Sequence, residues 1–151
     1  MLSKISMLLL IISALISCSS NDDVVITELG KNRQLWISSQ IENYSMNERI
    51  SCFCAGLLEW DVFVENGEKV SVEFDETNLP PNQTSQDVLD NARTIEDAFA
   101  LIEDLMTRNV ASLVIEYNET YGFPTLISVD FDFNIADDEI AYIYSNFIIT
   151  N

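Results

Sequence analysis

The spacing of hydrophobic residues switches between two periods along this chain, and the order of the switches restricts the fold more than any other feature. A helical spacing over 29–43, with Thr27 as its N-cap, precedes a stretch of strand-like segments. A second helical spacing over 95–108 is capped by Thr94, with Asp97 three residues later, and again precedes strand-like segments. Each helix therefore comes before a run of strands, which is typical of an α+β fold.

Six segments have the alternation or the composition of strands. In chain order they are 49–55, 57–64, 70–74, 112–117, 124–133 and 139–149. Asn66-Gly67, between the second and third segments, is a strong signal for a type I′ hairpin. Residues 75–93 read as a long loop with a turn of helix at 86–91. We therefore predict an antiparallel sheet of about six strands with two helices packed on one face, in the order α-β-β-β-α-β-β-β.

Several segments together carry a family resemblance. They are Tyr44, Cys52-Phe53-Cys54, the Asn66-Gly67 hairpin, the helix start at 94–102, the segment 116–125 with its Tyr-Gly-Phe-Pro-Thr, and Ala136-Asp137-Asp138-Glu139. In that order they resemble the DUF6174 family of bacterial, often lipid-anchored, proteins of unknown function, over roughly residues 35–148. Asn118 departs from the pattern, because family members often carry Asp there. The resemblance implies an exported, anchored domain and supplies no activity.

The amino-terminal residues 1–17 have the parts of an export signal. Lys4 gives the positive start, and the apolar run that follows is about a dozen residues long, where a membrane-spanning helix needs roughly 20. Leu15-Ile16-Ser17-Cys18 ends the run and resembles a bacterial lipobox. In that class the cysteine receives a diacylglycerol, the signal is cut before it, and the new amino terminus is acylated. The alternative is an ordinary cleaved signal with an incidental cysteine.

The lipobox interpretation divides the chain into three parts. Residues 1–17 are the lipoprotein signal peptide, 18–27 hold the lipidated Cys18 and a flexible acidic tether, and 28–151 form a single globular domain. The expected membrane partner is the lipid bilayer itself, through the anchor. Ser19 after the cysteine resembles the pattern of lipoproteins that proceed to an outer membrane. We expect a protein of the bacterial cell envelope, outside the cytoplasm.

Charge excludes several classes of function. The chain has 7 Lys and Arg against 25 Asp and Glu, no His, and a formal charge of −18. Phosphate contacts need a basic surface, so nucleic acid is excluded as a partner. The absence of His removes His-based catalytic triads. Hydrophobic residues make up 48% of the chain, which predicts a folded body in spite of the charge.

Cys52 and Cys54 form the pair that remains once Cys18 is lipidated. An even pair in an oxidising compartment favours a disulfide. Residues i and i+2 of a regular strand lie about 6.6 Å apart, near the upper limit for a bridge, so a bond here needs a bend at Phe53. The alternatives are buried thiols or a redox dithiol, and the redox reading needs positive charge that only Arg49 offers nearby in sequence.

The acidic residues at 130–139 are the weak candidates for calcium, and they are Asp130, Asp132, Asn134, Asp137, Asp138 and Glu139. Alternating carboxylates before a turn can collect around a hard cation. The spacing departs from the known calcium loop, because Ile135 follows Asn134 and Ala141 stands where a final Glu belongs. The competing interpretation is a strand whose Val129, Phe131 and Phe133 are buried while the acids face solvent.

No motif for catalysis or for a cofactor emerges from the residues. The chain carries no nucleophile elbow, phosphate-binding glycine loop or zinc motif, and acidic pairs are expected by chance among so many carboxylates. The loop Tyr117–Pro124 is a further candidate for binding, with packing over the sheet edge as the alternative. We expect a binding or structural envelope lipoprotein with an envelope protein as partner, and not an enzyme. The alternatives are a redox protein using Cys52 and Cys54 or a calcium-dependent binding module.

Overall fold

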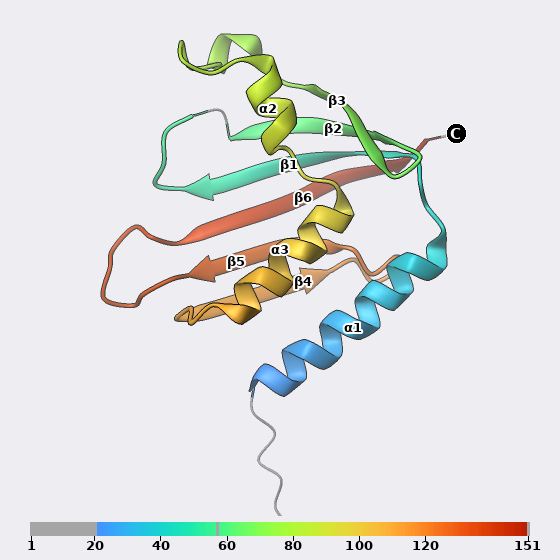
Figure 1. The fold of residues 1–151 in the computed structure, drawn as a ribbon, viewed down its shortest axis with the longest axis vertical. Coiled ribbons are helices and arrows are strands. Elements are labelled where there is room, and N and C mark those ends of the chain that lie inside the picture. The colour runs from blue at the N-terminus through green and yellow to red at the C-terminus, as the bar shows by residue number, and fades with distance from the viewer. Residues whose placement is uncertain (1–20, 57, 151) are drawn as a thin grey trace, which may run out of the picture.

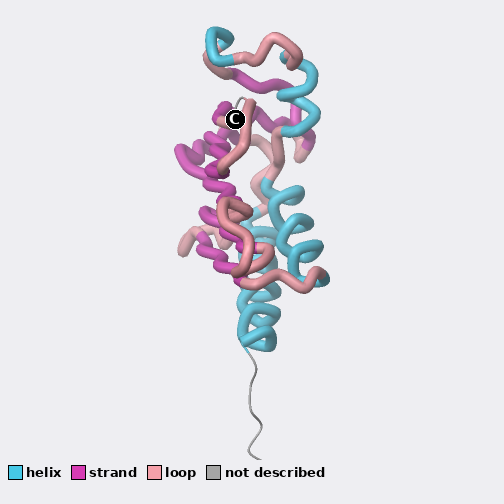
Figure 2. Tube along the Cα trace, turned by 90° about the vertical axis from the view of Figure 1, so that its left-hand side faces the viewer, coloured by secondary structure: helices cyan, strands magenta, loops and turns pink. Residues whose placement is uncertain are grey.

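The structure is a computed structural model and describes residues 21–56 and 58–150. The predicted signal peptide, Cys18 and Leu57 lie outside the described residues. The described part forms two layers, a six-stranded sheet and a layer of helices (Figure 1). Figure 2, turned by 90°, shows the helices together on one side of the strands. The predicted α+β fold with helices on one face of an antiparallel sheet is confirmed.

The sheet has the strand order β3-β2-β1-β6-β5-β4, and all its neighbouring strands are antiparallel. The strands are β1 (Tyr44–Cys52), β2 (Glu59–Glu65), β3 (Glu68–Glu73), β4 (Ser112–Tyr117), β5 (Pro124–Asp130) and β6 (Ile140–Ile149). Each half of the chain contributes three consecutive strands. The two halves meet where β1 pairs with β6, with Glu48 opposite Tyr144.

Three α-helices lie on one face of the sheet, and they are α1 (Asn21–Ser39), α2 (Ser85–Asn91) and α3 (Ile95–Thr107). A 3₁₀ turn, η1 (Glu76–Asn78), follows β3 and buries no residue. Capping boxes start the last two helices. The Thr84 hydroxyl accepts from the Asp87 backbone N–H at α2, and Thr94 does the same with Asp97 at α3. The predicted cap of α3 is confirmed, and the helical turn predicted at 86–91 is the short helix α2.

The core lies between α3, α1 and the sheet. Ile95, Phe99 and Ile102 of α3 are fully buried, and so is Ile127 of β5. Trp36 brings α1 to the same layer, where its ring meets Tyr44, Phe123 and Phe147 edge-on at centroid distances of 5.7–6.0 Å. The Tyr44 hydroxyl accepts from the Ile95 N–H at 2.9 Å, which ties β1 to the start of α3.

The first helix differs from its predicted bounds. It begins at Asn21, so Thr27 lies inside it and is not its N-cap, and the prediction of a flexible tether over 18–27 is wrong for residues 21–27. The prediction followed hydrophobic spacing, and the helix begins with the polar residues Asn21-Asp22-Asp23. The helix ends at Ser39, where Gln40 with φ 53° reverses the chain, and β1 begins at Tyr44. The buried Glu48 hid the start of this strand, because it interrupts the hydrophobic alternation.

The fifth strand also ends earlier than predicted. β5 stops at Asp130, and the following loop leaves Phe133 74% exposed, so the prediction that Phe133 belongs to the buried face is wrong. The cause is local, because the Asp132 N–H donates to the Asp138 side chain at 3.0 Å and closes a loop instead of extending the strand. Val129 keeps its predicted place in the core. In the described part of the chain, no helix combines the length and apolar character that crossing a membrane requires.

Two glycines provide a test of how closely α1 packs on the turn before β5. Gly122 has φ 78°, and a Cβ there would lie 2.3 Å from the Asn32 carbonyl oxygen of α1. Gly122→Ala should therefore lower the free energy of unfolding by about 1–3 kcal/mol, measured by urea denaturation. Gly30→Ala is the matched control within α1, because a Cβ there would meet no described atom within 4 Å. It should raise the free energy of unfolding by up to about 1 kcal/mol, and equal effects of the two substitutions would contradict the packing.

Candidate functional site

A cavity opens at the end of the sheet where β1 and β3 stop and β2 begins. It has a volume of about 580 Å³, within the range of sites that bind small molecules or side chains. Its lining residues are Asn47, Arg49, Ile50, Gly56, Leu58, Glu59, Trp60, Asp61, Glu73, Phe74, Asp75 and Asn78. The cavity therefore lies between the connection from β1 to β2 and the connection from β3 to η1.

Apolar side chains form part of this lining. Ile50, Leu58 and Phe74 are half-buried beside the buried Trp60. The Ile50 N–H donates to the Leu58 carbonyl at 2.7 Å, which fixes the wall contributed by the loop after β1. The lining thus offers hydrophobic contact at the same place as charge.

The charge around the cavity is mainly negative. Asp61 stands directly opposite Glu73 across β2 and β3, and Glu59 stands opposite Arg49 across β2 and β1. The Asn47 amide donates to Asp61 Oδ1 at 3.0 Å. Asp75 accepts from both the Thr77 hydroxyl and its N–H, and these bonds lower the pKa of its carboxyl. The lining thus includes four carboxyl side chains and one guanidinium.

The predicted disulfide pair lies at the edge of this site. The structure joins Cys52 to Cys54, with the Cα atoms 5.3 Å apart, because β1 ends at Cys52 and the chain bends at Phe53. Phe53 is 84% exposed. The pair stands immediately before the segment that supplies Gly56 and Leu58 to the cavity wall.

The calcium candidates gather in the loop between β5 and β6, where most of their contacts are with one another. Asp132 Oδ1 accepts from the N–H and the amide of Asn134, and these bonds lower the pKa of Asp132. Asp130 behaves in the opposite way, since desolvation and the nearby Asp138 and Glu139 raise its pKa. Asp137 has a positive φ of 68° in the turn. Across residues 21–56 and 58–150, no three or more His, Cys, Asp or Glu residues are grouped to hold a metal ion.

The loop Tyr117–Pro124 packs into the fold rather than standing free. Phe123 is buried, and its ring lies 4.5 Å from that of Phe147. Tyr121 contacts the same ring at 5.8 Å. The packing alternative for these aromatic residues is therefore the correct one.

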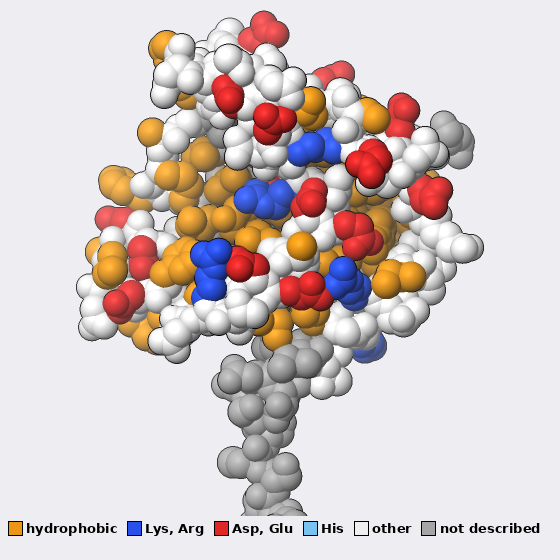
Figure 3. Space-filling view, viewed as in Figure 1, with side chains coloured by type: hydrophobic (Ala, Val, Ile, Leu, Met, Phe, Trp, Pro, Cys, Tyr) orange, Lys and Arg blue, Asp and Glu red, His pale blue; other side chains and the backbone are white. Residues whose placement is uncertain are grey.

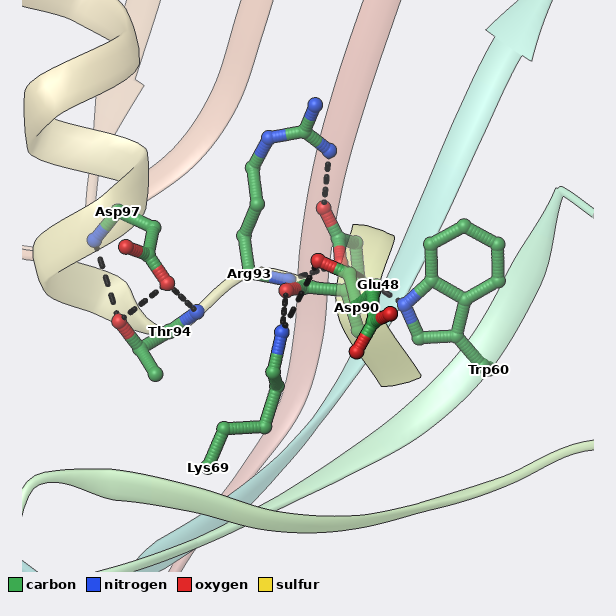
Figure 4. Close-up of polar contacts among 8 residues, drawn as sticks. Glu48, Trp60, Lys69, Asp90, Arg93, Thr94 and Asp97 are labelled. Carbon is green, nitrogen blue, oxygen red and sulfur yellow. Dashed lines mark hydrogen bonds and ion pairs between the residues drawn. The ribbon is translucent and has the colours of Figure 1, made fainter. Parts of the chain in front are cut away.

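A buried carboxylate beneath the cavity was missed from the sequence. Glu48 is fully buried on β1, and Figure 4 shows it between Trp60 and Arg93. Its Oε2 accepts from Trp60 Nε1 and from the Arg93 N–H, each at 2.8 Å, and Oε1 accepts from Arg93 Nη1 at 3.0 Å. Both oxygens are occupied by donors, so Glu48 holds the structure together and is not free for chemistry.

The sequence also did not indicate that Asp61 and Glu73 stand opposite each other at the cavity, because a shift in strand register brings them together. A regular two-residue hairpin at Asn66-Gly67 would put Asp61 opposite Val72. A bulge between Phe63 and Val64 shifts the pairing by one residue and puts Asp61 opposite Glu73. The alternation of acidic with apolar residues in β2 is the one signal in the sequence that pointed to an acidic row here.

Comparison with known proteins gives a family but no characterised relative. Residues 28–149 match DUF6174, described as a family of unknown function. No curated protein and no solved structure matches the chain.

The buried carboxylate gives a prediction about stability. Glu48→Ala leaves Arg93 and the Trp60 N–H without their acceptor, so the free energy of unfolding should fall by about 3–5 kcal/mol in urea denaturation. Glu48→Gln keeps an acceptor and should lose less. Glu103→Ala is the control, because Glu103 pairs with Arg33 at an exposed position and should cost at most about 1 kcal/mol. A loss for Glu48→Ala no larger than that of the control would contradict the role given to Glu48.

The acidic loop, which runs from Asp130 at the end of β5 to Glu139 before β6, gives a prediction about pH. The raised pKa of Asp130 means that its ionised form is disfavoured in the fold, so Asp130→Asn should raise the melting temperature at pH 7. The lowered pKa of Asp132 means that its ionised form stabilises the fold, so Asp132→Asn should lower the melting temperature at pH 7. The Asp130 difference should shrink as the pH falls from the raised pKa of Asp130 towards the ordinary Asp value of 3.8, whereas the Asp132 difference should shrink only as the pH falls below 3.8 towards the lowered pKa of Asp132. Melting followed by circular dichroism checks this, and shifts of the same sign would contradict it.

Proposed function

The chain belongs to the DUF6174 family, and from that membership and its own residues we propose that it is a lipid-anchored protein of the bacterial envelope that binds a partner outside the cytoplasm and catalyses no reaction. Leu15-Ile16-Ser17-Cys18 is the observation that carries this proposal. A diacylglycerol and an N-acyl chain on Cys18 would give durable anchoring, because each buried methylene contributes about 0.8 kcal/mol.

The position of α1 supports a short attachment. Only Ser19 and Ser20 separate Cys18 from Asn21, where the helix begins. The same helix continues into the core through Leu29 and Trp36. The folded body is therefore held close to the proposed anchor by a helix and not by a long flexible linker.

The charge of the body supports an outward-facing role. Figure 3 shows acidic side chains spread over the helix-bearing face with fewer basic ones between them. The formal charge of −18 disfavours electrostatic contact with anionic lipid, so the acyl chains supply the attraction to the membrane. A negative surface favours a cationic partner.

A second candidate function is thiol–disulfide exchange at Cys52 and Cys54. The exposure of Cys54 and of the neighbouring Phe53 favours it, because a partner thiol can reach the bond there. Thiol labelling of growing cells separates the two functions. Cycling between labelled and protected cysteines indicates exchange, whereas permanent protection indicates a structural bond.

The proposed anchor is tested by substitution of its cysteine. Cys18→Ala expressed in a bacterial host should keep its signal peptide and incorporate no labelled palmitate, as measured by metabolic labelling and intact mass. Cys52→Ser is the control and should be cleaved and labelled like the unsubstituted chain. A cleaved, palmitate-labelled product from Cys18→Ala would refute the anchor.

A further inference from the structure

We propose that the cavity at the end of β1, β2 and β3 receives a Lys or Arg side chain of a partner polypeptide. This inference rests on the binding role proposed above and is independent of the lipid anchor. The cavity joins an apolar lining to unbalanced negative charge, and these two properties match the two parts of a basic side chain.

The apolar lining fits the aliphatic stem. Ile50, Leu58 and Phe74 contribute hydrophobic surface at the cavity, and Phe74 also offers an aromatic ring to a cation. The volume of about 580 Å³ is far larger than a single dehydrated metal ion fills. A polyamine would place charge along its whole length against this apolar wall, whereas Lys and Arg carry charge at the end alone.

The acidic residues fit the cationic head. Asp61 and Glu73 stand directly opposite each other, and like charges in that position destabilise a sheet. The ion pairs found in residues 21–56 and 58–150 include neither of them. Asp75 stays ionised through its bonds from Thr77, and Arg49 is opposite Glu59. A guanidinium or ammonium from a partner would relieve the repulsion between Asp61 and Glu73.

The same two strands provide a matched control. Glu65 stands opposite Glu68 beside the Asn66-Gly67 turn, at the other end of the β2–β3 pair. Neither residue lines this cavity. The control pair therefore has the like-charge register outside this cavity.

The test is a nuclear magnetic resonance titration of the full chain, purified in a non-ionic detergent. The probe is a capped Gly-Leu-Arg-Leu-Gly peptide, and the backbone amides of Asp61 and Glu73 report binding. We expect saturable binding with a Kd below about 1 mM at low salt, weakened about fivefold by Glu73→Gln and less than twofold by Glu68→Gln. The peptide with Gln in place of Arg should bind at least fivefold more weakly than the probe.

Several results would overturn the inference. They are the absence of saturable binding, equal weakening by Glu73→Gln and Glu68→Gln, and binding of spermidine as tight as that of the peptide, which would assign the cavity to a free polyamine. Melting temperature gives a second readout. Glu73→Gln should raise the melting temperature of the unliganded protein because it removes repulsion, and a decrease would show a structural role instead. Because the titration does not depend on acylation, an unmodified Cys18 would refute the anchor alone.

Discussion

The pairing of β1 with β6 makes one sheet out of two three-stranded halves that are far apart in sequence. Each half places a helix layer on the same face, so the core can form only when these two strands are in register. Tyr44 on β1 and Phe147 on β6 show the result, because their rings lie 5.3 Å apart under Trp36 of α1. The cavity and the acidic loop both lie at the end of the sheet where β1 stops and β6 starts.

Glu48 helps to fix that register. A slip of one residue along β1 would turn its carboxylate to the opposite face of the sheet, away from Trp60 and Arg93. The cost of burying a charge makes such a slip unfavourable, even though a buried ion pair adds little net stability by itself. Arg93 also lies over the Tyr142 ring of β6 at 4.6 Å, so one side chain from the segment between α2 and α3 contacts both central strands. The Glu48–Arg93 ion pair thus helps to specify the register of β1 while adding little to the net stability of the fold.

The sequence predicted those parts of the fold that follow from local patterns. The Thr94 cap with Asp97, the Asn66-Gly67 turn and the bounds of β4 all depend on residues that lie close together along the chain. The errors arose where a contact that the hydrophobic spacing does not show decides the outcome. The predicted start of β1 was too late because the buried Glu48 pairs with Arg93, 45 residues away. The predicted end of β5 was too late because the N–H of Asp132 donates to the Asp138 side chain. The same limit concealed the facing acids of the cavity.

The bulge in the β2–β3 hairpin explains why the cavity combines charge with an apolar wall. Without it, Asp61 would face Val72, and Glu73 would fall on the helix-bearing side of the sheet. With it, two carboxylates share one side at the end of the strands, and Val72 comes to stand opposite Val62 on the packed face. A bulge re-aims side chains at a cost in regular pairing. This one brings like charges together, a further cost in the free protein that a cationic partner would offset. Local stability is thus lowered at the place where the fold leaves a cavity open to a ligand.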